Sequence, residues 1–114
     1  MSFTGMLKEG SLHDKVILIT GGGTGLGKSM GKYFMELGAN LIITSRKQDV
    51  LDETAKEFSD YSGEILPISG DVRNAKEVEQ IIETSLHKFG KIDVLVNNAA
   101  GNFISPTERL TTKA

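Results

Sequence analysis

A glycine-rich stretch near the start of the chain constrains its fold more than any other feature. It covers residues 20–27, has glycine at 21, 22, 23, 25 and 27, and directly follows the apolar run 16–19. A helix-like spacing of apolar residues comes next, at Leu26, Met30, Phe34 and Leu37. A strand, a tight glycine turn and a helix start in this order supply positive φ values, a bare backbone and unpaired amide N–H groups. The stretch therefore predicts a turn that binds a phosphate group.

Length and composition exclude several classes of protein. The 114 residues can build one hydrophobic core, and the net charge of −2 argues against a nucleic-acid or membrane-surface partner. The absence of cysteine excludes disulfides and a thiolate nucleophile. No apolar run approaches about 18 residues, and residues 1–15 lack the apolar core of a signal peptide. We expect a cytoplasmic protein with no membrane span and no metal site.

Four apolar runs alternate with three helix-like patterns along the chain. After a polar arm over residues 1–14, the apolar runs lie at 16–19, 41–44, 65–69 and 92–96. This alternation predicts an α/β fold of the Rossmann type, a doubly wound parallel sheet with helices on both faces and strand order 3-2-1-4. Residues 15–114 would form the N-terminal, nucleotide-binding half of such a fold.

Single residues refine this expectation. Pro67 has no N–H to donate to a neighbouring strand, which predicts that the third strand lies at a sheet edge. Asn74 with Glu77 three residues later predicts a capping box at the start of the third helix. Gly38 and Gly90 follow helical patterns and are expected to end them.

The second apolar run ends in a way that bears on the choice of nucleotide. An NAD-preferring site places an Asp or Glu there, against the ribose 2′-hydroxyl, whereas this chain has Ser45, Arg46 and Lys47. An arginine matches a 2′-phosphate in both geometry and charge, so Arg46 favours NADP over NAD. The alternative is a solvated loop arginine, which leaves the missing acid unexplained.

The ends of the third and fourth runs supply further candidate contacts. Asp71 can accept a hydrogen bond from an adenine amino group while Val72 packs against the ring, although Asp71 can instead cap the turn before Asn74. The amides of Asn97 and Asn98 can tie neighbouring strands together, and the small residues after them allow close approach of a ribose or nicotinamide. The complete predicted cofactor site is Gly21, Gly23, Thr24, Gly25, Leu26, Gly27, Arg46, Asp71, Val72, Asn98, Ala99 and Gly101.

Three of these motifs together resemble the short-chain dehydrogenase/reductase superfamily. They are Thr20-Gly21-x-x-x-Gly25-x-Gly27, Asp71-Val72 and Asn97-Asn98-Ala-x-Gly101. The longer strings at 19–28, 45–47 and 97–110 are similar, more narrowly, to the 2,4-dienoyl-CoA reductases. This resemblance implies reduction of an unsaturated fatty acyl-CoA by NADPH in fatty-acid β-oxidation, by a protein that assembles as a homotetramer.

The resemblance also implies roles for individual residues. Arg46 would contact the 2′-phosphate of NADPH and the phosphates of CoA, and Arg73 would help to hold the acyl-CoA. Phe103 and the region of Thr111 would line the substrate channel, although ordinary packing is the alternative for Phe103.

The sequence departs from the family in its catalytic residues. The family pairs a tyrosine with a lysine as Tyr-x-x-x-Lys, whereas Tyr33 is followed four residues later by Leu37 and Tyr61 by Ile65. A strand at 92–96 would also have an unpaired far edge if the chain ended at Ala114. We therefore expect the N-terminal part of a longer reductase, with no catalytic residue in these 114 positions. The alternatives are a reductase of 3-oxoacyl thioesters or sugars, and a nucleotide-binding fragment without catalysis.

Overall fold

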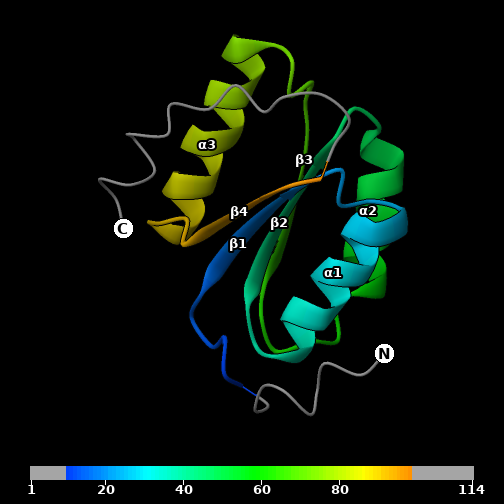
Figure 1. Ribbon diagram of the computed structural model, residues 1–114, viewed down its shortest axis with the longest axis vertical. Coiled ribbons are helices and arrows are strands. Elements are labelled where there is room, and N and C mark those ends of the chain that lie inside the picture. Colours follow the sequence, from blue (N-terminus) through cyan, green and yellow to red (C-terminus); the bar gives the residue numbers. More distant parts are fainter. Residues whose placement is uncertain (1–9, 99–114) are drawn as a thin grey trace.

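A computed structural model describes residues 10–98 of the chain. Strands and helices alternate throughout this part (Figure 1), as the spacing of the apolar runs predicts. The elements in order are β1 (Val16–Thr20), α1 (Gly25–Glu36), β2 (Asn40–Ser45), α2 (Gln48–Glu57), β3 (Ile65–Ser69), α3 (Ala75–Phe89) and β4 (Val94–Asn97).

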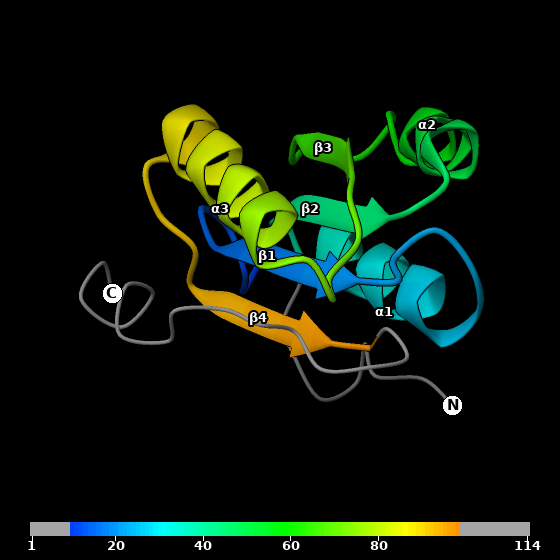
Figure 2. The ribbon, with the colours of Figure 1, turned by 90° about the horizontal axis from the view of Figure 1, so that it is seen from above.

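The four strands form one parallel sheet in the order β3-β2-β1-β4. Figure 2 shows this order, with β3 and β4 at opposite edges of the described sheet. Ile17 of β1 lies opposite both Leu41 of β2 and Val94 of β4, and Pro67 lies in the edge strand β3. The prediction of a doubly wound parallel sheet with order 3-2-1-4 is confirmed, as is the edge position of Pro67.

Two apolar clusters lie on opposite faces of the sheet, because successive side chains of a strand point to opposite faces. Val16 and Leu18 of β1 pack with buried residues of α3, whereas Ile17 and Ile19 pack with α1 and α2. Figures 1 and 2 show α3 on one side of the sheet and the other two helices on the other. The helices thus cover both faces and leave the carboxyl ends of the strands accessible.

Caps fix the ends of the helices. At the start of α3, Asn74 Oδ1 accepts hydrogen bonds from the N–H groups of Lys76 and Glu77. The second half of the expected capping box differs, because the Glu77 carboxylate accepts from Asp71 N (3.1 Å) in the preceding loop. Gly38 and Gly90 have φ values of +97° and +80° just beyond α1 and α3, which confirms that glycines end these helices.

The fourth strand begins two residues later than the apolar run at 92–96 suggests. The Asp93 carboxylate accepts a hydrogen bond from Val16 N (2.8 Å), and Asp93 N donates to Val16 O (2.8 Å), so Asp93 joins the start of β4 to β1. Val94 is 45% exposed, because no strand within residues 10–98 lies on the far side of β4.

Candidate functional site

Three chain segments meet at the carboxyl ends of the strands. They are the glycine turn after β1, the segment after β2 and the segment after β3. Between them lie two cavities of about 220 and 270 Å³, which share Gly21, Ser45 and Arg46. The three shared residues place the two cavities side by side, and together they are called the cleft. Each cavity alone is smaller than the roughly 300–1,000 Å³ of most small-molecule sites.

The glycine turn has a backbone shape that other residues would not adopt easily. Gly21 and Gly25 have φ values of +69° and +57°, in the region where glycine is favoured. A Cβ atom at Gly27 would collide with the carbonyl oxygen of Gly21 and lie 2.7 Å from Nδ2 of Asn98. The turn is closed against β2 by a hydrogen bond from Gly21 N to Thr44 O (2.7 Å).

The N-terminus of α1 opens onto this cleft. Thr24 is the N-cap in an extended conformation, its side chain makes no capping hydrogen bond, and the first turn contains no acidic residue. The first amide N–H groups of a helix lack intrahelical partners, and the helix dipole favours an anion beside them. These features suit a phosphate at this position.

Hydrogen bonds join the ends of β1 and β4 beneath the cleft. The fully buried Thr20 hydroxyl lies 3.2 Å from Asn97 Oδ1 and accepts from Asn98 N at 2.8 Å. Asn98 Nδ2 donates to the carbonyl of Gly21 at 3.3 Å. The two asparagines thus tie the strands together, as the sequence indicates, and Asn98 also holds the glycine turn.

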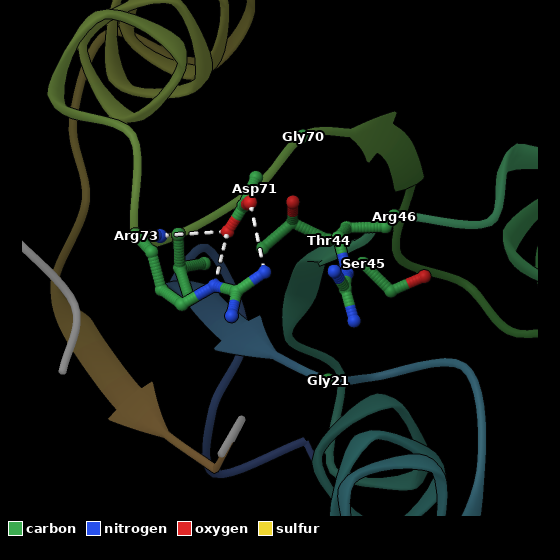
Figure 3. Close-up of a pocket in the computed structure, with 8 residues that line it drawn as sticks. Gly21, Thr44, Ser45, Arg46, Gly70, Asp71 and Arg73 are labelled. Carbon is green, nitrogen blue, oxygen red and sulfur yellow. Dashed lines mark hydrogen bonds and ion pairs between the residues drawn. The ribbon is translucent and has the colours of Figure 1, made fainter. Parts of the chain in front are cut away.

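An ion pair occupies the segment after β3. Asp71 Oδ1 accepts from the backbone N (2.9 Å) and Nε (3.1 Å) of Arg73, and Oδ2 accepts from Nη2 (3.2 Å), as Figure 3 shows. These side-chain hydrogen bonds, followed by the backbone one and by the charges of Arg73 and Arg46, lower the pKa of Asp71. The same carboxylate raises the pKa of Arg73. Asp71 therefore lines the cleft as an anion, with both oxygens already partly used.

The sequence does not indicate that Arg73 and Asp71 bind each other. Their pair closes the local turn that is the alternative role of Asp71, and it also lies in the cleft. Val72, between them, is 7% exposed and belongs to the apolar cluster beneath α3, so it forms part of the floor of the cleft.

Arg46 lines both cavities from the end of β2. Figure 3 shows its guanidinium and that of Arg73 extending into the space above Gly21. Among residues 10–98, no carboxylate forms an ion pair with Arg46. Its charge is therefore available to an anionic ligand, with Lys47 beside it in the second cavity.

Leu26 and a buried threonine complete the surroundings of the turn. Leu26 is 68% exposed at the start of α1, which is unusual for a large apolar side chain and leaves it available to a ligand. Thr54 of α2 donates its hydroxyl hydrogen to the carbonyl of Gly23 at 3.1 Å. The spacing of apolar residues in α2 is compatible with Thr54 on the buried face of this helix, but it does not identify the partner of Thr54, which lies 31 residues earlier.

Several predicted contacts lie outside the described residues. These are Ala99, Gly101, Phe103 and Thr111. Within residues 10–98, no group of His, Cys, Asp and Glu side chains could hold a metal ion, and no helix is long and apolar enough to cross a membrane.

The described fold and the sequence motifs match one family of nucleotide-binding proteins. Residues 15–114 match the family model described as short chain dehydrogenase. The chain belongs to the short-chain dehydrogenase family. This family consists of oxidoreductases that use nicotinamide cofactors.

Within the short-chain dehydrogenases, the chain is similar to proteins named as 2,4-dienoyl-CoA reductases. The chain is 41% identical over 100 residues to a probable 2,4-dienoyl-CoA reductase of Bacillus subtilis, covering 88% of this chain and 39% of the relative. It is 42% identical over 104 residues to a peroxisomal 2,4-dienoyl-CoA reductase of Rattus norvegicus, covering 90% and 36%. The chain thus spans less than two fifths of the length of these relatives.

A solved structure supports the same fold. L-sorbose reductase from Gluconobacter frateurii, crystallised with NADPH and L-sorbose, superposes with a TM-score of 0.76 at 28% identity, over 86% of this chain and 40% of that one. The short-chain dehydrogenase fold of residues 10–98 therefore has an NADPH-bound counterpart.

Proposed function

We propose that this chain forms the cofactor-binding part of an NADPH-dependent reductase that acts on 2,4-dienoyl-CoA in fatty-acid β-oxidation. The choice of NADPH rests on Arg46, which lies at the end of β2 beside the glycine turn and forms an ion pair with no carboxylate among the described residues. An arginine fork binds a 2′-phosphate bidentately, and no acid stands there to bind a 2′-hydroxyl. The two relatives named 2,4-dienoyl-CoA reductase support the substrate class.

In this proposal each part of the cleft holds one part of NADPH. The N-terminus of α1 faces the pyrophosphate, with contacts from Gly21, Gly23, Thr24, Gly25, Leu26 and Gly27. Asp71 accepts from the adenine amino group through a lone pair that Arg73 leaves unused, and Val72 packs beneath the ring. Asn98, Ala99 and Gly101 lie against the ribose or nicotinamide. When bound, the cofactor supplies the hydride that reduces the conjugated acyl chain.

Arg46, Arg73, Phe103 and Thr111 are proposed to contact the acyl-CoA. Arg73 would have to divide its donors between Asp71 and a CoA phosphate, since the Asp71 carboxylate already uses two of its side-chain nitrogens. The proposal assigns no proton donor among these 114 residues, since they contain no Tyr-x-x-x-Lys. A homotetramer in the cytoplasm, with residues 15–114 as the cofactor half of each subunit, completes the proposal; the rat relative is named as peroxisomal.

Oxidation of NADPH by the intact purified protein tests this function. We expect oxidation with 2,4-dienoyl-CoA but not with 3-oxoacyl-CoA or a sugar, and a higher kcat/KM with NADPH than with NADH. Oxidation with 3-oxoacyl-CoA alone would identify a different reductase. Tight NADPH binding without oxidation of any of these substrates would instead indicate a nucleotide-binding protein without catalysis.

A further inference from the structure

Thr54 makes an unusual contact for a threonine inside a helix. A helical threonine commonly bonds the carbonyl three or four residues before it, within its own helix. Thr54 instead donates to the carbonyl of Gly23 in the glycine turn at 3.1 Å, and its side chain is shielded from water because the residue is only 1% exposed. The hydrogen bond therefore joins α2 to the turn across the interior.

Packing of α2 around the same glycine supports this contact. A Cβ atom at Gly23 would lie 3.0 Å from Val50 Cγ1 and 3.5 Å from Leu51 Cδ2, so α2 rests closely on the backbone of the turn. The Gly23 peptide is consequently held by apolar contacts and by one buried hydrogen bond. A buried carbonyl that lost this bond would be left unsatisfied, which is strongly unfavourable.

Because a peptide unit is planar, fixing the Gly23 carbonyl also fixes the orientation of the Thr24 N–H. The carbonyl of Gly23 and the N–H of Thr24 belong to one planar trans peptide unit, so they point in opposite directions. A carbonyl that points inward to Thr54 requires the Thr24 N–H to point away from Thr54, and Thr24 itself is exposed. Gly23 and Thr24 both line the cavity that also holds the cationic side chains of Arg46 and Lys47.

We propose that Thr54 is a positioning residue that holds the Thr24 N–H toward a phosphate group of the cofactor. This inference rests on the proposed binding of a nicotinamide cofactor and adds a residue that touches neither cofactor nor substrate. Thr54 acts only through the Gly23 peptide, by keeping it in the orientation that phosphate binding needs. In the proposed function this phosphate is part of the pyrophosphate, which NADH shares, and the test below distinguishes it from the 2′-phosphate, which is present in NADPH alone.

Three variants of the intact purified protein test the inference. Thr54→Val removes the hydroxyl while keeping the shape of the side chain, and Thr54→Ser keeps the hydroxyl. Ser85→Ala is the matched control, because Ser85 is also fully buried and donates its hydroxyl to a carbonyl (Ile81 O, 2.7 Å), but on α3 across the sheet. Calorimetric affinity for NADPH and NADH, steady-state KM and kcat, and thermal unfolding are measured for each.

We expect Thr54→Val to weaken NADPH binding by about tenfold, which is the loss of one hydrogen bond to a charged group. The KM for NADPH should rise while kcat at saturating cofactor stays near that of the wild type. Thr54→Ser and Ser85→Ala should bind NADPH within about twofold of the wild type, since a twofold change is only a fraction of such a bond. If Thr54→Val weakens NADH binding as much as NADPH binding, the phosphate held by the Thr24 N–H belongs to the pyrophosphate. If only NADPH binding is weakened, it is the 2′-phosphate.

Two results would overturn the inference while leaving the proposed function intact. One is wild-type cofactor affinity in Thr54→Val, and the other is equal weakening in Thr54→Ser and Thr54→Val, which would attribute the effect to packing. A wild-type protein that binds neither cofactor would reject the proposed function and this inference together.

Discussion

The two sides of the cleft are built from different interactions. The glycine turn is held by neutral hydrogen bonds: the Thr54 hydroxyl donates to the Gly23 carbonyl, and Asn98 Nδ2 donates to the Gly21 carbonyl. Asn98 is in turn held by the Thr20 hydroxyl, which accepts from its backbone N–H, and Thr20 and Thr54 are only 0% and 1% exposed. The opposite side consists of charged groups near water, and the side chains of Asp71 and Arg73 are 28% and 60% exposed. In the proposed function the first side shapes the phosphate site, and the second distinguishes NADPH from NADH.

This difference predicts how each side responds to substitution. Removing one partner of a buried hydrogen bond leaves a polar group unsatisfied, whereas an exposed ion pair typically contributes only about 0–1 kcal/mol. Changes in the glycine turn should therefore affect every nucleotide together with folding. Changes on the charged side should alter the choice of nucleotide and leave the fold intact.

The largest effect is expected for Gly27→Ala. The new Cβ atom would collide with the backbone of Gly21, which cannot move without disturbing its hydrogen bond to Thr44. Overpacking of this kind costs about 1–3 kcal/mol of stability, and displaced amides lose bonds to phosphate of about 1.5–3 kcal/mol each. Binding of NADPH and NADH should fall alike, by more than about 100-fold, as measured by calorimetry.

Gly90→Ala is the matched control for this substitution. Gly90 has a φ of +80° and open space around its Cα, so alanine is strained there without a collision. The free energy of unfolding of the Gly90→Ala variant should fall by about 1–2 kcal/mol, while its affinity for NADPH and NADH stays unchanged. If Gly27→Ala bound both cofactors normally, the turn would not be the rigid side of the cleft.

A smaller and more selective effect is expected for Arg46→Asp. The substitution replaces a partner of the 2′-phosphate with a repulsive charge, and a hydrogen bond to a charged group is worth about 1.5–3 kcal/mol. Affinity for NADPH should fall roughly 30-fold, while affinity for NADH should change by less than about threefold. Lys32→Glu on α1 makes the same change in net charge away from the cleft and serves as the control. Equal losses for both cofactors would reject the assignment of Arg46.

Local sequence patterns were sufficient to predict the helices, the strands and the order of the strands in the sheet. The apolar runs and the glycine turn give the strand order, because right-handed crossovers and a phosphate-binding turn after β1 permit few arrangements. Pro67 marks an edge strand and Gly90 a helix end for reasons contained in the residues themselves. Arg46 could be proposed to bind the cofactor because its position at the end of the second strand follows from the same strand order.

The contacts that stiffen the site could not be predicted in this way. Thr54 meets Gly23 across 31 residues, and Thr20 meets Asn98 across 78, so no periodicity connects them. A threonine on an apolar helix face is equally compatible with simple packing. The ion pair of Arg73 with Asp71 spans only two residues, but the sequence does not determine which way a long, exposed side chain turns.

The smallest effect is expected for Arg73→Gln, on the charged side of the cleft. The hydrogen bonds from the Arg73 side chain are the main cause of the lowered pKa of Asp71, so their loss should raise that pKa toward its ordinary value of 3.8. The depressed pKa contributes stability above the unfolded-state pKa, and this contribution is lost as the pH falls through the folded-state value. The variant should therefore have a smaller contribution of this kind at neutral pH, so its stability should fall less than that of the wild type as the pH drops through this range.

At neutral pH Asp71 stays ionised in both proteins, so NADPH affinity should change by less than about threefold, as expected for an exposed pair. Carbon NMR titration of the carboxyl groups measures the pKa directly. Lys91→Gln is the control, because Lys91 pairs with Asp93 (3.3 Å) and should leave Asp71 unaffected. An unchanged Asp71 pKa in Arg73→Gln would reject the pair. A raised KM for acyl-CoA with unchanged NADPH affinity would show that Arg73 serves the substrate as well, because the guanidinium can donate to Asp71 and to a CoA phosphate at the same time.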